Sequence, residues 1–384
     1  MNIMFQVGSW HFQKGGSDLF VRTISYWLAK RGHKVVVLAH RLEEEKCGDE
    51  DIKIGKGIIK IRYTPSQRKG IRFNPLIYAY RLMITSSHLY NLAKEEDVDV
   101  IVVGETELLS VLPLKLLRTK IACRGGALLY ETMSKEIIKE RGKGVYSSAF
   151  ILLIKLYNLL TLKLPDVMIP VNKAEYDFMK LHKRRNAGIE IIPHGVDIRL
   201  FKPTRKKKTG KLTVGYAGRL APIKYPEVVL EIFKDALKHT KNTEFIWVGP
   251  LAPSAGKNYF EELKKKIGIR NARHIGQVKN EELPKVLGRF DVFLQAEQQK
   301  NVSRSTTEAA ACGLPIVALN IGKELYGFFT MDKEKAKNEL RKLATNIDYR
   351  TSAGNKARKI IEDNFSEDKI YEKYARMFKE IAGK

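Results

Sequence analysis

Two cations stand five positions apart, directly after a predicted strand in the second half of the chain. The run 212–217 has the pattern of a buried strand and is followed by Gly218, Arg219 and, after a short loop, Lys224. Open α/β sheets bind ligands outside the carboxyl ends of their strands. Cations at this edge would stabilise the negative charge that grows on a departing diphosphate, as a metal ion would. The alternative is a pair of solvated surface cations, which a basic chain has in number.

A second candidate site opens a helix in the same half of the chain. The segment 300–315 follows another predicted strand and contains Ser303, Arg304 and Glu308. Free amides and small hydroxyls at a helix N-terminus suit an anion, and a carboxylate such as Glu308 can accept hydrogen bonds from ribose hydroxyls. The run 305–308, Ser-Thr-Thr-Glu, is also a capping-box pattern, in which the glutamate only satisfies backbone donors.

A glycine pair, Gly15 and Gly16, follows the first predicted strand and precedes a predicted helix over 17–31. Glycine lets the backbone approach a ligand closely, and the free amides of the helix N-terminus can face an anionic group. An ordinary tight turn between strand and helix explains the same pair.

The elements that must position these residues alternate between short β-rich runs and longer helical patterns. This alternation is typical of βαβ units around a parallel sheet. A length of 384 residues favours two domains. The predicted strands are 3–7, 34–39, 58–62, 98–103, 120–123 and 167–171 in the first half, and 212–217, 245–248, 273–275, 292–295 and 316–319 in the second.

The two predicted domains span 1–175 and 176–362, and their join falls within 172–208, where Pro-His-Gly and a charged run interrupt regular structure. The last segment, 363–384, contains an amphipathic helix over 366–382 that is capped by Ser366 and must dock on an apolar surface.

The composition limits the choice of partners and compartment. A formal net charge of +26 indicates an acidic partner, such as an anionic membrane or a phosphorylated substrate. No nucleic-acid recognition module is visible, so nucleic acid is disfavoured. Three cysteines without metal-ligand spacing predict a reducing compartment and no metal site. The N-terminus has the pattern of a strand rather than a secretion signal. The apolar stretch 149–164 is too short to span a bilayer and suits either a core helix or a membrane-surface helix.

In sequence motifs, the chain resembles the large retaining glycosyltransferase family 4, which has the GT-B fold. The matching motifs follow in order along nearly the whole chain. They are the Gly15-Gly16 loop with 28–35 (LAKRGHKV), 192–197 (IPHGVD) with 201–203 (FKP), 218–220 (GRL) with Lys224, and 308–318 (EAAACGLPIVA).

The resemblance implies two Rossmann-like, doubly wound parallel-sheet domains facing across a cleft, with the last helix crossing back to the first domain. It implies a nucleotide-sugar donor in the C-terminal domain and an acceptor in the N-terminal one. Arg219 and Lys224 match the family's diphosphate-binding pair, Glu308 its ribose-binding glutamate, and Gly16 the glycine near the phosphates. Retaining enzymes of this type act by holding the two substrates together and stabilising the diphosphate, without a cofactor or metal.

Two positions depart from the family pattern. Lys300 stands where the family has a first glutamate that contacts the donor sugar, with Glu297 three residues earlier. Arg124 follows the strand 120–123, where the family commonly has a histidine, and is expected to contact the sugar or a phosphate. The expected donor-site set is therefore Gly16, Ser303, Arg304, Glu308 and Lys300.

The expected activity is transfer of a hexose-type sugar from a UDP- or GDP-sugar to a glycan or lipid-linked acceptor. The expected location is the cytoplasm, with peripheral attachment to the inner face of the cell membrane. Two other classes remain open. A nucleotide-sugar epimerase of the same fold would convert the donor without an acceptor. A non-catalytic basic binding protein would bind polyanions with strong salt dependence.

Overall fold

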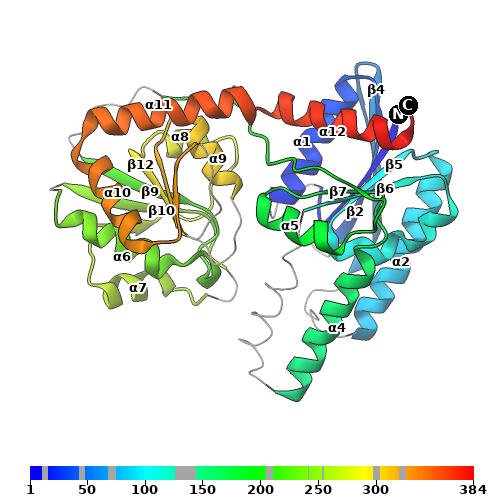
Figure 1. Cartoon of the computed structure of the whole chain (residues 1–384), viewed down its shortest axis with the longest axis horizontal. Coiled ribbons are helices and arrows are strands. Elements are labelled where there is room, and N and C mark those ends of the chain that lie inside the picture. Colours follow the sequence, from blue (N-terminus) through cyan, green and yellow to red (C-terminus); the bar gives the residue numbers. More distant parts are fainter. Residues whose placement is uncertain are drawn as a thin grey trace. The chain divides into compact units, whose positions relative to one another are not determined.

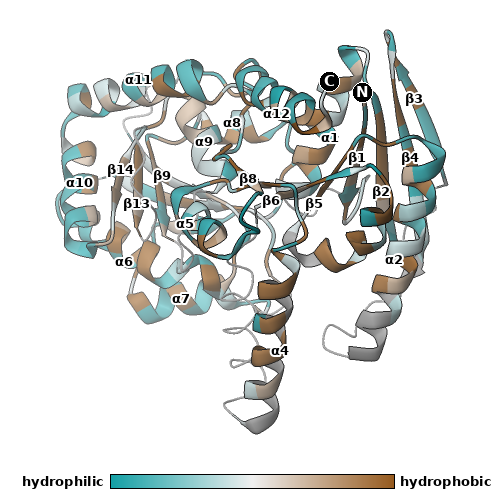
Figure 2. Ribbon diagram, turned by 45° about the vertical axis from the view of Figure 1, so that its right-hand side comes forward, coloured by the Kyte–Doolittle hydropathy of each residue, from teal (hydrophilic) through white to brown (hydrophobic). Residues whose placement is uncertain are grey.

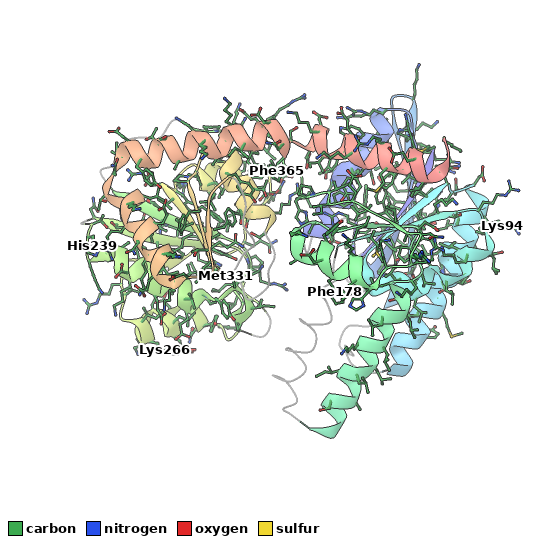
Figure 3. All side chains as sticks on the ribbon, viewed as in Figure 1. Lys94, Phe178, His239, Lys266, Met331 and Phe365 are labelled. Atoms are coloured by element: carbon green, nitrogen blue, oxygen red, sulfur yellow. The ribbon has the colours of Figure 1, made fainter. Side chains whose placement is uncertain are left out.

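The chain folds into two compact units, each built on one β-sheet (Figure 1). The first unit comprises Met1–Pro193 with Tyr371–Lys384, and the second comprises His194–Ile370. Figure 3 shows the side chains of each unit filling the space between its sheet and its helices. The computed structural model describes residues 1–10, 16–42, 48–67, 75–125, 144–204, 211–240, 242–252, 255–296, 303–319 and 326–384.

The first unit has an eight-stranded sheet in the order β3-β4-β2-β1-β5-β6-β7-β8. Neighbouring strands are parallel except for the pair β3 and β4. The middle strands β1, β5 and β6 are mostly apolar and bury most of their residues, as expected where helices cover both faces of a parallel sheet. The strands are β1 (Asn2–Val7), β2 (Lys34–Leu42), β3 (Glu50–Ile54), β4 (Gly57–Gln67), β5 (Val100–Val103), β6 (Lys120–Arg124), β7 (Val167–Ile169) and β8 (Gly188–Ile189).

All helices described for the first unit except the last, α12, lie between consecutive strands of this sheet. The first of them, α1 (Gly16–Lys30), buries Phe20, Ile24 and Leu28 at helical spacing. The others are α2 (Pro75–Glu95), the 3₁₀ helix η1 (Glu105–Leu116), α4 (Val145–Thr161), α5 (Lys173–His182) and α12 (Glu367–Ala382), which belongs to this unit from Tyr371 onward.

The second unit has a six-stranded, fully parallel sheet in the order β11-β10-β9-β12-β13-β14. Tyr216 and Trp247 stack in its core with ring centroids 4.1 Å apart. The strands are β9 (Leu212–Ala217), β10 (Thr243–Val248), β11 (Ala272–His274), β12 (Val292–Ala296), β13 (Ile316–Leu319) and β14 (Phe328–Thr330). The helices are η2 (Pro222–Lys224), α6 (Pro226–Leu237), α7 (Tyr259–Ile267), α8 (Leu283–Leu287), α9 (Arg304–Ala311), α10 (Lys333–Thr345) and α11 (Ile347–Asn364).

The predicted strands are all present, and three further strands lie at or near sheet edges. β3 forms an antiparallel hairpin with β4 through Gly55, whose φ of 57° suits glycine. Its sequence, EDIKI, alternates charged and apolar residues on an exposed edge and lacks the continuous apolar run of a buried strand. β8 pairs with β7, so the first unit extends beyond residue 175, and β14 adds a half-buried edge to the second sheet.

Helix α4 turns a row of leucines outward, which we call the leucine face: Leu152, Leu153, Leu156 and Leu160. These side chains are 47–72% exposed. The interpretation of 149–164 as an ordinary core helix is therefore wrong for this face. Figure 2 shows hydrophobic residues recurring along α4. Within the described ranges, no helix is both long and apolar enough to cross a membrane.

Helix α12 carries the amphipathic pattern predicted for 366–382, and the Ser366 hydroxyl accepts a hydrogen bond from the Lys369 amide at 3.4 Å. Its aromatic side chains pack within the first unit. Tyr371 contacts Trp27 edge-on, and the Tyr374 ring lies 5.1 Å from that of Phe20. These contacts explain why the segment from Tyr371 onward belongs to the first unit although it follows the second in sequence.

Candidate functional site

The loop after β9 is held tightly against the end of β10. A Cβ on Gly249 would lie 2.1 Å from the Gly218 carbonyl oxygen, so the two backbones meet where only glycine fits. The Trp247 indole donates a hydrogen bond to that oxygen at 2.9 Å. Leu220 then pairs with Leu251 as an isolated parallel bridge. The backbone on both sides of position 219 is therefore anchored.

Arg219 lies between these anchors, and its side chain is exposed. Lys224 ends the short 3₁₀ helix η2 and is half-buried. Both cations thus follow the carboxyl end of β9, as the sequence predicted. After β9 the chain adds β10 and β11 on one side of this strand and then β12 on the other, so the strand order reverses beside β9. The two cations follow the carboxyl end of β9 and therefore lie at this reversal point, where open α/β sheets bind ligands.

Helix α9 begins at the same edge, and hydroxyl side chains fasten its first turn. Ser303 is the N-cap residue, and its hydroxyl donates to the Gln295 side-chain oxygen at 3.1 Å. Thr306 donates to the same oxygen, and Ser305 donates to the Ala217 carbonyl at 2.5 Å. Gln295 is fully buried at the end of β12. The helix N-terminus is therefore fixed to the ends of the two strands that flank the reversal point, where its free amides suit an anion.

Arg304 and Glu308 form a buried ion pair within α9. The guanidinium Nε lies 2.9 Å from the Glu308 carboxylate, and another guanidinium nitrogen lies 3.2 Å from the carboxylate of Glu367. Burial raises the pKa of Glu308, while the charge of Arg304 opposes this shift. Because the N-cap position is Ser303 rather than Ser305, and the Glu308 carboxylate pairs with the Arg304 side chain, the capping-box alternative is wrong.

Glu367 ties this ion pair to the start of α12. Val196 and Ser366 pair as a parallel bridge, and a Cβ on Gly195 would lie 3.1 Å from the Glu367 Cα. The motif at 192–197 is thus packed against the first turn of α12. Beside it, the ring of Phe365, labelled in Figure 3, contacts the ring of Tyr326 edge-on, with the two ring centroids 5.3 Å apart. Through Arg304 and Glu367, the Glu308 carboxylate of α9 is therefore connected to the first turn of α12, where the chain passes from the second unit to the first.

Arg124 and Gly16 lie in the first unit. Arg124, the last residue of β6, donates from Nε to the Tyr374 hydroxyl at 2.8 Å, and its guanidinium lies 3.8 Å from the Phe20 ring centroid. Burial raises the pKa of Tyr374, so this phenol stays neutral. Gly16 is exposed at the start of α1, with nothing within 4 Å of the place a Cβ would take.

Two family models match the chain almost end to end. Residues 14–200 match "Glycosyltransferase Family 4", and residues 197–362 match "Glycosyl transferases group 1". Together they cover both units. The chain belongs to this family of glycosyltransferases.

Curated relatives of this glycosyltransferase are distant. It is 23% identical over 314 residues to a phosphatidylinositol N-acetylglucosaminyltransferase subunit of Arabidopsis thaliana, which covers 80% of the chain and 65% of the relative. It is 24% identical to the D-inositol 3-phosphate glycosyltransferase of Corynebacterium jeikeium, covering 41% of each. Spore coat protein SA of Bacillus subtilis is 26% identical over 42% of the chain. The chain thus spans between 41% and 65% of the length of these relatives.

Solved structures match the whole glycosyltransferase chain. Sucrose-phosphate synthase from Thermosynechococcus elongatus superposes with a TM-score of 0.79 at 14% identity, covering 99% of this chain and 98% of that one. Anabaena HepE, solved with UDP-glucose, gives a TM-score of 0.71 at 16% identity, covering 99% of this chain and 100% of that one. The predicted GT-B fold, with two parallel-sheet α/β domains, is confirmed.

The other predicted site residue, Lys300, lies outside the described residues, as does Glu297. Its contact with a donor sugar stays a prediction. In the part of the chain that the structure describes, no three His, Cys, Asp or Glu side chains are grouped as metal ligands.

Proposed function

We propose that this glycosyltransferase moves a hexose-type sugar from a UDP- or GDP-sugar to a glycan or lipid-linked acceptor, with retention of configuration at the transferred carbon. The glycosylated acceptor would be an intermediate in the synthesis of a cell-surface polysaccharide, a glycolipid or a glycoprotein. The observation that carries the proposal is the convergence of Arg219, Lys224 and the N-terminus of α9 at the reversal point of the second sheet. The bound UDP-glucose of Anabaena HepE, a structure of the same fold, supports a nucleotide-sugar donor.

In this proposal Arg219 and Lys224 stabilise the departing diphosphate, since cations aimed at developing negative charge lower the barrier. The free amides of α9, next to Ser303, hold a phosphate. Glu308, paired with Arg304, accepts hydrogen bonds from the ribose hydroxyls. No protein nucleophile is required, because holding donor and acceptor in register supplies much of the rate.

In the first unit, Arg124 and the amides beginning at Gly16 contribute to the acceptor side and to the phosphates. Arg124 is already oriented by Tyr374 and Phe20, so its guanidinium is not free to rotate away. No cofactor or metal ion is part of the proposed mechanism.

The test is a screen of nucleoside diphosphates and their sugar conjugates by isothermal titration and by release of nucleoside diphosphate. We expect one nucleoside diphosphate to bind and its sugar conjugate to be slowly hydrolysed by the full chain without acceptor. Conversion of the donor to an isomeric nucleotide-sugar would indicate an epimerase. If no nucleotide binds while polyanions bind with steep salt dependence, the chain is a basic binding protein and the proposal fails.

We infer further that the first unit attaches peripherally to an anionic membrane through the leucine face of α4, on the cytoplasmic side. Exposed leucines beside basic residues are typical of helices that lie in a membrane interface. Lys155 and Lys163 lie close enough to His182 to lower its pKa, after the larger effect of burial, so positive charge gathers beside this face. Leu181, on the neighbouring helix α5, is 76% exposed.

Buried free thiols at Cys123 and Cys312 suit a reducing compartment.

Replacing Leu153 and Leu156 together by serine should lower binding to anionic vesicles at least tenfold. Each leucine that inserts contributes about 1.5–3 kcal/mol when fully buried, and the serines remove that contribution. Flotation with phosphatidylserine-containing vesicles measures it. The matched control is Ile347→Ser, which changes an exposed residue of the second unit (65% exposed) and should leave binding unchanged. Equal flotation of the double variant and wild type would contradict the inference.

A further inference from the structure

Strand β3 forms an open edge of the first sheet. The order of the sheet places it at one end, and the strand that it pairs with among the described residues is β4 (Figure 2). Glu50, Asp51 and Lys53 are exposed, while Ile52 and Ile54 are half-buried. An edge of this kind presents backbone groups that another strand can join. Proteins usually protect such edges with a proline, a bulge or charged side chains, but β3 has no proline and no shift in register, and its charges are of both signs.

The register of the β3–β4 hairpin determines which backbone groups face outward. Ile54 pairs with Gly57 across a two-residue loop. The residues that flank such a loop exchange hydrogen bonds, and hydrogen-bonded and non-hydrogen-bonded positions then alternate along an antiparallel pair. Counting back from Ile54, every second residue of β3 bonds to β4. The backbone N–H and C=O groups of Asp51 and Lys53 therefore face the open edge.

The side chains of Asp51 and Lys53 lie on one face of β3, because side chains alternate along a strand. Asp51 is held in place by Arg62 of β4, whose guanidinium nitrogen lies 2.7 Å from the carboxylate. No ion pair joins Lys53 to another described residue. The edge thus carries a carboxylate and an ammonium group on either side of Ile52.

This pattern is complementary to itself when a second copy of β3 runs antiparallel about a twofold axis at Ile52. Asp51 then lies opposite Lys53 of the second copy, and Lys53 lies opposite Asp51 of the second copy. Both positions have outward backbone groups, so each pair exchanges hydrogen bonds and joins opposite charges. An axis at Asp51 or at Lys53 would instead place two like charges directly opposite each other, which is unfavourable.

We propose that β3 pairs with β3 of a second copy of this chain, forming a twofold dimer in which the two first sheets continue into one another. A contact of this kind uses the same edge of both copies, so association stops at the dimer. The proposal does not depend on the transferase function, because it involves only one edge of the first unit.

The dimer should be weak. Each strand contributes five residues, and two copies with a net charge of +26 repel each other. We expect dimers to form at about 10–100 µM protein, because one strand pair is a small interface beside the roughly 1,200–2,000 Å² of stable complexes.

The test is sedimentation velocity of the full chain over this concentration range and below it. Wild type should change from monomer to dimer as its concentration rises. Lys53→Asp and Asp51→Lys should each weaken dimerisation at least about tenfold, because each places like charges opposite each other in both pairs. Both positions are exposed, and an exposed ion pair such as that of Asp51 with Arg62 contributes little stability, so both variants should fold.

An equimolar mixture of Lys53→Asp and Asp51→Lys tests the register. Each variant should be monomeric alone. In the mixture every aspartate of one variant lies opposite a lysine of the other, so a heterodimer should form. Its recovery would also show that neither variant had lost dimerisation through misfolding of the hairpin.

Two controls make the result specific to this edge. Lys56→Asp changes an exposed lysine of the hairpin loop, with the same change in net charge as Lys53→Asp, and should leave the dimer intact. The double serine variant at Leu153 and Leu156 should also dimerise as wild type does. If it were monomeric while Lys53→Asp dimerised, association would belong to the leucine face and the proposal would be wrong. Wild type that stays monomeric or forms larger oligomers, Lys53→Asp that dimerises like wild type, or a mixture that stays monomeric would each overturn it.

Discussion

Arg219→Ala should lower kcat for sugar transfer by about 10²–10³-fold, the loss typical of removing one group that stabilises a developing anion. The exposed guanidinium follows β9, and the Gly218–Gly249 contact and the Leu220–Leu251 bridge hold its backbone rigidly. Such a group needs little reorganisation when charge appears on the diphosphate. Initial rates of nucleoside diphosphate release at saturating donor measure the effect.

Two further variants make this expectation specific. Arg219→Lys keeps the charge but loses the planar fork, so its rate should fall between those of wild type and Arg219→Ala. Arg270→Ala removes another exposed arginine of the second unit, which precedes β11 and so belongs to the amino edge of the parallel sheet. It should leave the rate unchanged. If Arg219→Ala turned over donor at a rate within twofold of wild type, Arg219 would not be the residue that stabilises the departing diphosphate.

The buried strands were predictable because their residues are apolar on both faces. The strands 212–217 and 316–319 match β9 and β13 to the residue, and both are buried along nearly all of their length. Edge strands carry no such pattern. β3 alternates charge with apolar residues, and only pairing with β4 makes it a strand. The helix over 149–164 was predictable as a helix, but its outward leucines depend on what packs beside it.

The candidate site divides in the same way. Arg219, Lys224 and Ser303 could be predicted because they directly follow strands, and strand ends meet at one sheet edge. The partner of Arg304 at Glu367 could not, because the two residues are 63 positions apart and meet only through tertiary packing. Gln6 of β1 carried no signal either. That its amide is buried without partners among the described residues is visible only in the folded structure.

The burial of Glu308 should make the stability of the chain depend on pH. Burial raises the pKa of this carboxyl group in the folded chain, against the opposing charge of Arg304. Between the unfolded and the folded pKa, the folded chain retains a proton that the unfolded chain has released. The contribution of Glu308 to the free energy of unfolding therefore decreases as pH rises through this window, and the penalty is complete above the folded pKa. Glu308→Gln removes this dependence, so its stability relative to wild type, measured by urea unfolding across this pH range, should increase with pH.

Arg304→Met should have the larger effect, because it leaves a buried carboxylate without its cation. Removing one partner of a buried ion pair typically costs about 3–5 kcal/mol, measured here by urea unfolding at neutral pH. The Arg304→Met/Glu308→Gln double variant should recover most of that loss, since no buried charge remains at position 308. Nucleoside diphosphate binding gives an independent readout. Glu308 must be ionised to accept hydrogen bonds from ribose, so as pH is lowered the affinity should begin to fall at a higher pH in Arg304→Met than in wild type. If the affinity of the two proteins began to fall at the same pH, Arg304 would not hold Glu308 in its charged form. If the double variant were as unstable as Arg304→Met, the lost stability would come from the contact between Arg304 and Glu367.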